Sequence, residues 1–145
     1  MAQNVNPTFV KTPNIGATQI TTGTGSSGVV TVYSGGVSGS KITALMAVSI
    51  ATTASFDVQW GVSSGGTLFV YGTAVVAAGA GSTDSLPTVN LVSNANVPLA
   101  LDSDGNPFLF LPSSAYSLQA KSPATSSAWT TGSAIQVIAP SIGDF

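Results

Sequence analysis

The stretch FDVQWGVSSGGTLFVYGTAVV, residues 56–76, predicts two strands joined by a tight turn. Apolar side chains at positions 56, 58, 60 and 62 alternate with Asp57 and Gln59, so one face of this strand is expected in a core and the other outward. Residues 63–66 read Ser-Ser-Gly-Gly, a sequence typical of a hairpin loop. Residues 67–76 are rich in β-branched and aromatic side chains and return as the partner strand.

Similar signals recur on both sides of this hairpin, separated by glycine-rich breaks. Strands are expected at residues 29–33, 41–50, 88–91, 99–101, 108–111, 116–121 and 133–139. Residues 41–50 are apolar on both faces, which predicts a central strand covered on each side; a buried helix competes, but the β-branched residues favour a strand. Residues 1–24 are interpreted as an extended arm that contains Pro7 and Pro13 and ends in a strand near residues 18–22.

Eight or nine short strands with few helix-forming residues predict an all-β fold. We expect one domain, residues 25–145, with the architecture of an antiparallel β-sandwich or a jelly-roll-like domain, preceded by the extended N-terminal arm of residues 1–24.

The composition excludes most catalytic chemistry. The 145 residues include three lysines and five aspartates and no Arg, Glu, His or Cys, while Gly, Ala, Ser and Thr make up about half of the chain. Without His or Cys, the usual zinc, copper, haem and iron–sulfur sites cannot form, and no group with a pKa near neutrality can activate a nucleophile. We therefore expect no enzyme activity and no cofactor.

Charge and hydropathy limit the classes of partner that the chain can bind. The net charge of −2 and the isoelectric point near 4.3 disfavour nucleic acid and anionic lipid, which need clustered cations. We expect no secretory signal and no membrane span, and hence folding in a cytoplasm. The mean hydropathy of +0.42 allows the chain to collapse, and a surface of hydroxyl groups and backbone tolerates repeated packing against other protein.

The segment DSDGN, residues 102–106, offers alternating oxygen ligands at Asp102, Asp104 and Asn106, as at the start of a calcium loop. Its glycine falls one position early for that pattern, and no Glu exists to close the loop. The alternative is an Asp-Gly turn in which Gly105 supplies a positive φ, and this is the interpretation we favour.

Aromatic residues suggest a second kind of site. Most of them lie in predicted strands and are expected to pack in the core, although together they could form a sugar-stacking platform of a carbohydrate-binding module. Trp129 differs because it lies in a polar segment, and we expect it at an interface with a ligand or a neighbouring subunit. The N-terminal arm is either frayed or ordered only on a partner surface, with Pro7, Phe9 and Ile15 as interface candidates.

Several segments carry a resemblance to a known family: GSKI (39–42), VQWG (58–61), YGT (71–73), PLALDSDGNPFLFL (98–111) and GDF (143–145). Through them, most of residues 8–145 resembles small virion proteins of tailed bacteriophages, the capsid decoration proteins, also called cement or head-stabilising proteins.

The resemblance implies an all-β protein that binds the major capsid protein on the outer surface of the virion and stabilises the shell. It also implies a homo-oligomer, commonly a trimer, made in the host cytoplasm. The family supplies no catalytic residues. A tail or head-fibre component is the alternative within the virion.

Overall fold

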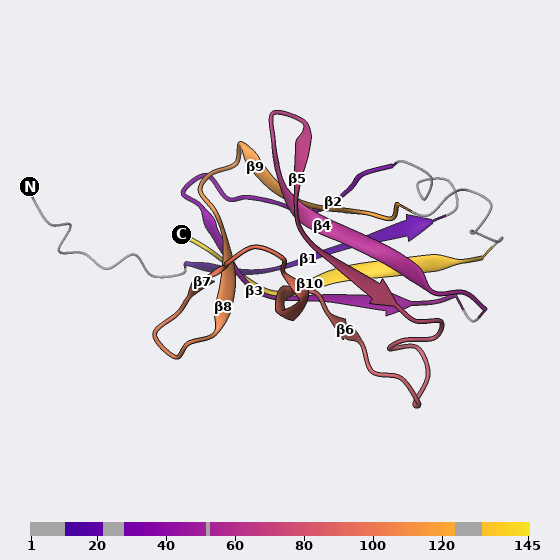
Figure 1. Ribbon diagram of the computed structural model, residues 1–145. Helices are drawn as coiled ribbons and strands as arrows, with labels where there is room; N and C mark the ends of the chain where they lie inside the picture. The colour runs from indigo at the N-terminus through magenta and orange to yellow at the C-terminus, as the bar shows by residue number, and fades with distance from the viewer. Residues whose placement is uncertain (1–10, 22–27, 52, 124–131) are drawn as a thin grey trace, which may run out of the picture.

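The computed structural model describes residues 11–21, 28–51, 53–123 and 132–145. These residues form strands with one short 3-10 helix, as follows: β1 (Thr12–Thr21), β2 (Val30–Ser34), β3 (Ser40–Ser49), β4 (Phe56–Ser64), β5 (Thr67–Val76), β6 (Val89–Asn90), η1 (Val92–Asn94), β7 (Ala100–Leu101), β8 (Pro107–Leu111), β9 (Tyr116–Lys121) and β10 (Ala134–Asp144). Two antiparallel sheets pack against each other, which confirms the predicted all-β sandwich (Figure 1).

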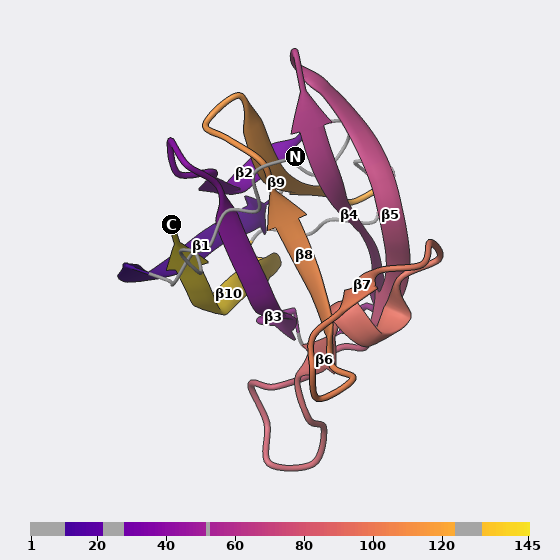
Figure 2. The same ribbon diagram turned by 90° about the vertical axis from the view of Figure 1, so that its left-hand side faces the viewer.

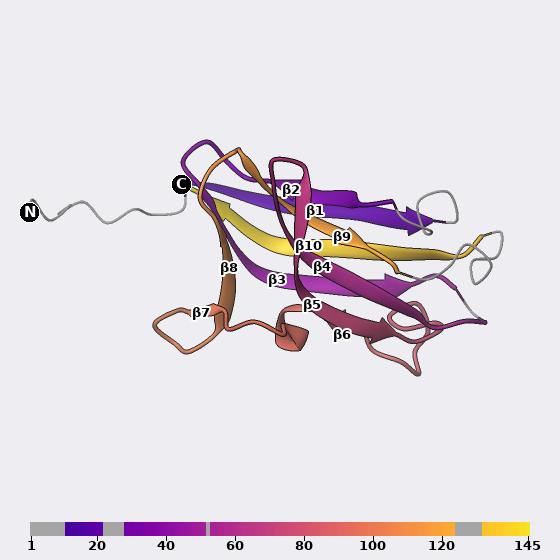
Figure 3. The same cartoon turned by 45° about the horizontal axis from the view of Figure 1, so that its top comes forward.

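The strand order is that of a jelly roll. The first sheet runs β1-β10-β3-β8-β7, with β6 also paired to β3, and the second runs β2-β9-β4-β5. The longer strands thus pair first with last: β1 with β10, β2 with β9, β3 with β8, and β4 with β5. The chain behaves as one long hairpin folded over into two layers, as in other double-sheet jelly rolls. Figure 2 shows β4 and β5 set apart from β1, β10 and β3, and Figure 3 shows β10 between β1 and β3.

The core lies between the two sheets and includes the predicted face of β4. Phe56, Val58 and Trp60 are at most 2% exposed, and they pack with buried residues of the facing sheet such as Ile42 and Val137. The predicted turn at the tip of this hairpin is present, and its two glycines have φ of +59° and +83°. Both values are positive, as a two-residue turn of the I′ type requires.

The boundary predicted at residue 24 is wrong for the second half of the arm. Residues 12–21 form β1, which pairs with β10 along its whole length and buries Ile20 completely. The alternation in this segment is weak because Gly16 occupies an inward position where a Cβ would lie only 2.7 Å from the carbonyl oxygen of Val32. Because β1 and β2 approach so closely, this position requires glycine. The apolar side chain that would otherwise show the strand pattern in the sequence is therefore missing. Residues 1–10 lie outside the described part of the chain.

The predicted central strand at residues 41–50 is β3, but it is not covered on both faces. Ile42, Leu45 and Ala47 are buried between the sheets, whereas Thr43 is exposed and Met46 only half-buried. Apolar residues therefore stand on the outer surface of the first sheet, where none of the described strands forms a covering layer.

The last predicted strand, residues 133–139, continues to Asp144. Pro140 lies inside this longer strand although proline cannot donate a hydrogen bond to a ladder. In β10 it lies where the register shifts between Ile138 and Ser141, and a bulge accommodates it. In the part of the chain that the structure describes, no helix is long and apolar enough to cross a membrane.

Candidate functional site

Part of the outer surface of the first sheet, over β1, β10 and the second half of β3, carries no charged side chain among the described residues. Ladder pairing aligns Ala17 of β1, Ile138 of β10 and Met46 of β3 in one row. Gln19, Gln136 and Val48 form the next row. Paired residues point to the same side of a sheet, so these six side chains share one face. We call this set, together with Ile15 and Pro140, the neutral face.

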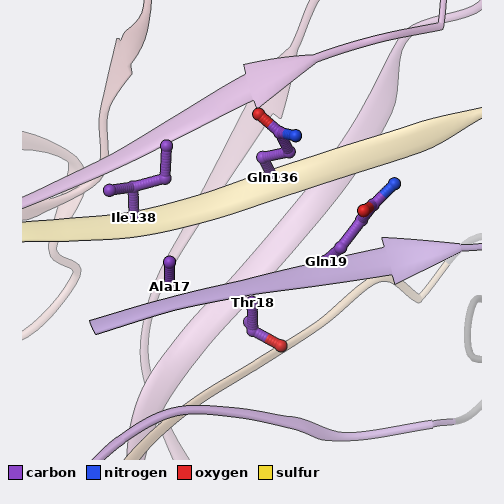
Figure 4. A pocket seen from close by; sticks show the side chains of 5 residues that line it. All are labelled: Ala17, Thr18, Gln19, Gln136 and Ile138. Carbon is purple, nitrogen blue, oxygen red and sulfur yellow. The ribbon is translucent and has the colours of Figure 1, made fainter. Parts of the chain in front are cut away.

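Two shallow hollows mark the neutral face. One of about 330 Å³ is lined by Ala17, Gln19, Gln136, Ile138 and the backbone neighbour Thr18. Figure 4 shows the first four pointing to the same side of the sheet and Thr18 pointing to the opposite side. The small Ala17 side chain between longer neighbours leaves this space open.

The second hollow, of about 530 Å³, lies where the bulge in β10 faces the start of β1, between Ile15 and Pro140. Ile15 is 71% exposed, more than an isoleucine needs for packing within the sandwich. The structure therefore places this predicted interface residue on the neutral face. Pro7, Phe9 and Trp129, the other predicted interface residues, lie outside the described residues.

The charged side chains lie around the neutral face. Asp57 and Lys121 belong to the second sheet, and Asp84 to the loop after β5. Lys41 is the nearest charge along β3, and its ammonium lies 4.5 Å from the centroid of the Phe108 ring. This cation–π contact holds the charge toward β8, away from Ile138 and Ala17.

The segment 102–106 forms the turn that connects β7 and β8. Asp102 Oδ1 accepts hydrogen bonds from the backbone N–H groups of Asn106, at 2.8 Å, and Asp104, at 3.0 Å. The Gly105 N–H donates to the Asp102 carbonyl oxygen, and Gly105 has φ of +81°. The carboxylate of Asp102 thus caps its own turn.

The same contacts set the ionisation of Asp102. The hydrogen bond from the Asn106 backbone holds the pKa of Asp102 below its usual range, helped by the Asp104 backbone and the nearby Lys41 and opposed by partial desolvation. Among the residues that the structure describes, no three acidic, His or Cys side chains come together in a cluster suited to a metal ion.

The aromatic residues that the structure describes do not form one platform. Phe56 and Trp60 are buried, while Phe69 on β5 is 56% exposed and Phe110 on β8 is 46% exposed. The Phe110 ring pairs instead with Phe145, at 5.9 Å between centroids.

Sequence reasoning missed Asp144, whose carboxylate accepts three side-chain hydrogen bonds from the described residues. Its carboxylate accepts hydrogen bonds from Asn14 Nδ2 at 2.6 Å, the Tyr33 hydroxyl at 2.7 Å and the Ser40 hydroxyl at 2.5 Å. These donors come from β1, β2 and β3, far apart in sequence, so no local pattern could have grouped them. The only sequence signal was an aspartate beside Gly143 in a chain with few charges.

The fold and this surface define a small jelly-roll domain whose first sheet carries the neutral face on its outer side. Comparison of the chain with protein-family models, with curated proteins and with solved structures finds no match.

Proposed function

We propose that this protein is a structural component of a bacteriophage virion that binds the outer surface of the assembled capsid and stabilises it. The observation that carries the proposal is the neutral face, a broad sheet surface with apolar and amide side chains and no charge. Contacts made by such side chains bury apolar area and form hydrogen bonds, and they gain little from ionic attraction.

Two further points support the proposal. Jelly rolls recur in viral capsid and lectin domains, although a fold by itself does not define a function. The segments that resemble decoration proteins include structural positions of the fold, namely the turn into β3, the centre of the β4–β5 hairpin, the β7–β8 turn and the end of β10. The resemblance therefore extends over both sheets.

The stabilising mechanism follows from repetition. A shell offers the same contact at many equivalent positions, and each copy that binds the assembled form but not the separated subunits shifts the equilibrium toward the assembled form. A modest affinity per site is sufficient, and avidity adds to it if the protein is a homo-oligomer. A trimer is the form that the resemblance implies, and light scattering of the purified protein tests it.

A charge placed on the neutral face tests the proposed contact. Ala17 is exposed, so Ala17→Asp can be solvated in the free protein. Buried against a shell, the same carboxylate loses its hydration without gaining a partner. We expect at least about a tenfold loss of affinity for mature shells, or about 1.4 kcal/mol.

Val75→Asp provides the matched control. Val75 lies on β5 of the second sheet and is 64% exposed, so this variant adds the same charge to another exposed strand. We expect Val75→Asp to bind shells like the wild type. Equal binding by both variants and the wild type would show that the neutral face does not contact the shell.

Two alternatives predict other observations. A tail or head-fibre component would be present at about a dozen copies or fewer per particle, whereas decoration requires copies on the order of hundreds. A carbohydrate-binding module would stack sugars on exposed rings, and Phe69 and Phe110 are exposed on separate sheets. Specific hits on a glycan array that disappear in Trp129→Ala would support that function over capsid binding.

A further inference from the structure

We propose that Asp144 is an acid-sensitive latch: its carboxylate closes one end of the sandwich at neutral pH, and its protonation opens this end locally while the rest of the domain stays folded. The Asp144 end is defined by Asp144 with Lys11, the turn at residues 35–39, and Phe145.

The latch joins both sheets. Asn14 on β1 and Ser40 on β3 belong to the same sheet as Asp144, whereas Tyr33 on β2 belongs to the other, and all three donate to the Asp144 carboxylate. The Ser40 hydroxyl also accepts a hydrogen bond from the Gly36 N–H at 2.7 Å, which ties the 35–39 turn to the same group. One carboxylate therefore organises three neighbouring strands and a turn.

The backbone around Asp144 depends on the same geometry. Lys11 N–H donates to the Asp144 carbonyl oxygen at 2.7 Å, and Phe145 N–H donates to the Gly39 carbonyl oxygen at 3.1 Å. A Cβ on Gly36 would come within 3.0 Å of the Asp144 carboxyl carbon, so the turn packs directly against the latch. Loss of the carboxylate interactions therefore weakens the contacts of Lys11, of the 35–39 turn and of Phe145 together.

Among the described residues, all the side-chain donors to the carboxylate are neutral. Among its hydrogen-bond partners only Tyr33 can titrate, and burial raises the pKa of Tyr33, so it stays protonated at acid and neutral pH. Lys11 contacts Asp144 through its backbone, and the Lys41 ammonium lies over the Phe108 ring. The charge on Asp144 is thus held by hydrogen-bond donors, each of which loses an ionised acceptor when the carboxyl group is protonated.

The sign of the pH dependence follows from these contacts. Desolvation of Asp144 raises its pKa, but the hydrogen bonds from Ser40, Tyr33 and Asn14 outweigh it and leave the pKa below the usual range. A group with a lowered folded-state pKa stabilises the fold fully above the ordinary value for Asp, about 3.9, and loses this contribution as the pH falls toward the folded-state value. The stabilisation by the latch therefore begins to fall below about pH 4 and is lost at lower pH.

Native-state hydrogen exchange by NMR tests the latch at single amides. The reporters are the N–H groups of Lys11, Gly36 and Phe145, and the references are those of Ser49 and Leu91, which donate to Ala80 and Leu45 in other parts of the fold. After correction for intrinsic rates, protection at the reporters should fall severalfold between pH 5 and pH 3 while the references keep theirs. A simultaneous loss at reporters and references would overturn the proposal, since it would mean global unfolding.

Two variants test the assignment to Asp144. Tyr33→Phe removes one donor that lowers the pKa of Asp144. Protection at the reporters should therefore be weaker than in the wild type at pH 5, and it should fall by a smaller factor between pH 5 and pH 3. Asp57→Asn alters an exposed aspartate of the second sheet and should leave the pH dependence of protection at the reporters unchanged. A Tyr33→Phe profile that coincides with the wild type, or an Asp57→Asn profile that shifts, would contradict the latch.

Discussion

Trp60 fills the centre of the sandwich and leaves one buried donor without a partner. Its side chain is 0% exposed, its ring lies 6.3 Å from that of Tyr71, and among the described residues its Nε1 has no hydrogen-bond acceptor. Gly72 lies against this ring: a Cβ there would be 2.6 Å from Nε1 and 2.7 Å from the carbonyl oxygen of Asn94. The glycine is required by space and not by an unusual φ.

We expect Gly72→Ala to lower the free energy of unfolding by about 1–3 kcal/mol, the usual cost of overpacking a core. Trp60→Phe should cost less than about 2 kcal/mol, because it removes the unpaired N–H together with part of the ring. In the double variant the added methyl group no longer meets Nε1. The double variant should therefore lose less unfolding free energy than the sum of the losses in the two single variants. Chemical denaturation of the four proteins measures this coupling, and strict additivity would contradict the contact.

The glycines of the β4–β5 turn act through conformation. Gly66 has φ of +83°, and a Cβ there would meet nothing within 4 Å. Gly66→Ala should therefore destabilise the protein by about 1–2 kcal/mol through backbone strain alone. Gly66→Asn should lose less stability than Gly66→Ala, because asparagine adopts a positive φ more readily than alanine. Equal losses in the two variants, measured by thermal unfolding, would show that strain is not the cause.

At the scale of strands, local alternation identified the β4–β5 hairpin and most other strands, because each carries its own pattern of inward and outward residues. It predicted the start of β1 too late, where Gly16 replaces an inward side chain, and the end of β10 too early, where a bulge absorbs Pro140. It also predicted that both faces of β3 are covered, whereas apolar residues such as Met46 lie on the outer surface.

The candidate surface was less predictable than the strands. Ile15 was identified from its apolar character alone, whereas Ala17, Gln136 and Ile138 join it only through pairing between β1 and β10. Their sequence separation exceeds any local window. The Asp144 contacts were missed for the same reason.

The pairing of β1 sharpens the expected role of the N-terminal arm. Removal of residues 1–24 would delete a strand that buries Ile20, so loss of shell binding in that variant would reflect unfolding. Removal of residues 1–10 leaves β1 intact and should preserve the thermal midpoint. If Pro7 and Phe9 contribute to anchoring, the shorter deletion weakens shell binding. Unchanged affinity would assign the contact to the folded domain alone.

At the scale of the whole molecule, the sparse charge predicts how shell binding responds to salt. Contacts that depend on ion pairs weaken as the Debye length falls from about 10 Å at 0.1 M to about 3 Å at 1 M salt. The neutral face offers no ions to screen. We expect the affinity for shells to change less than about threefold over this range, as measured by binding isotherms, in contrast to the steep dependence of charged interfaces.

Co-sedimentation with mature phage shells, beside a parallel assay with unassembled capsid subunits, measures the proposed function most directly. Binding to the shell surface predicts that the protein pellets with shells, saturates at copies on the order of hundreds per particle and does not bind the free subunits. Absence from the shell pellet, or equal binding to the free subunits, would contradict a role in stabilising the assembled capsid.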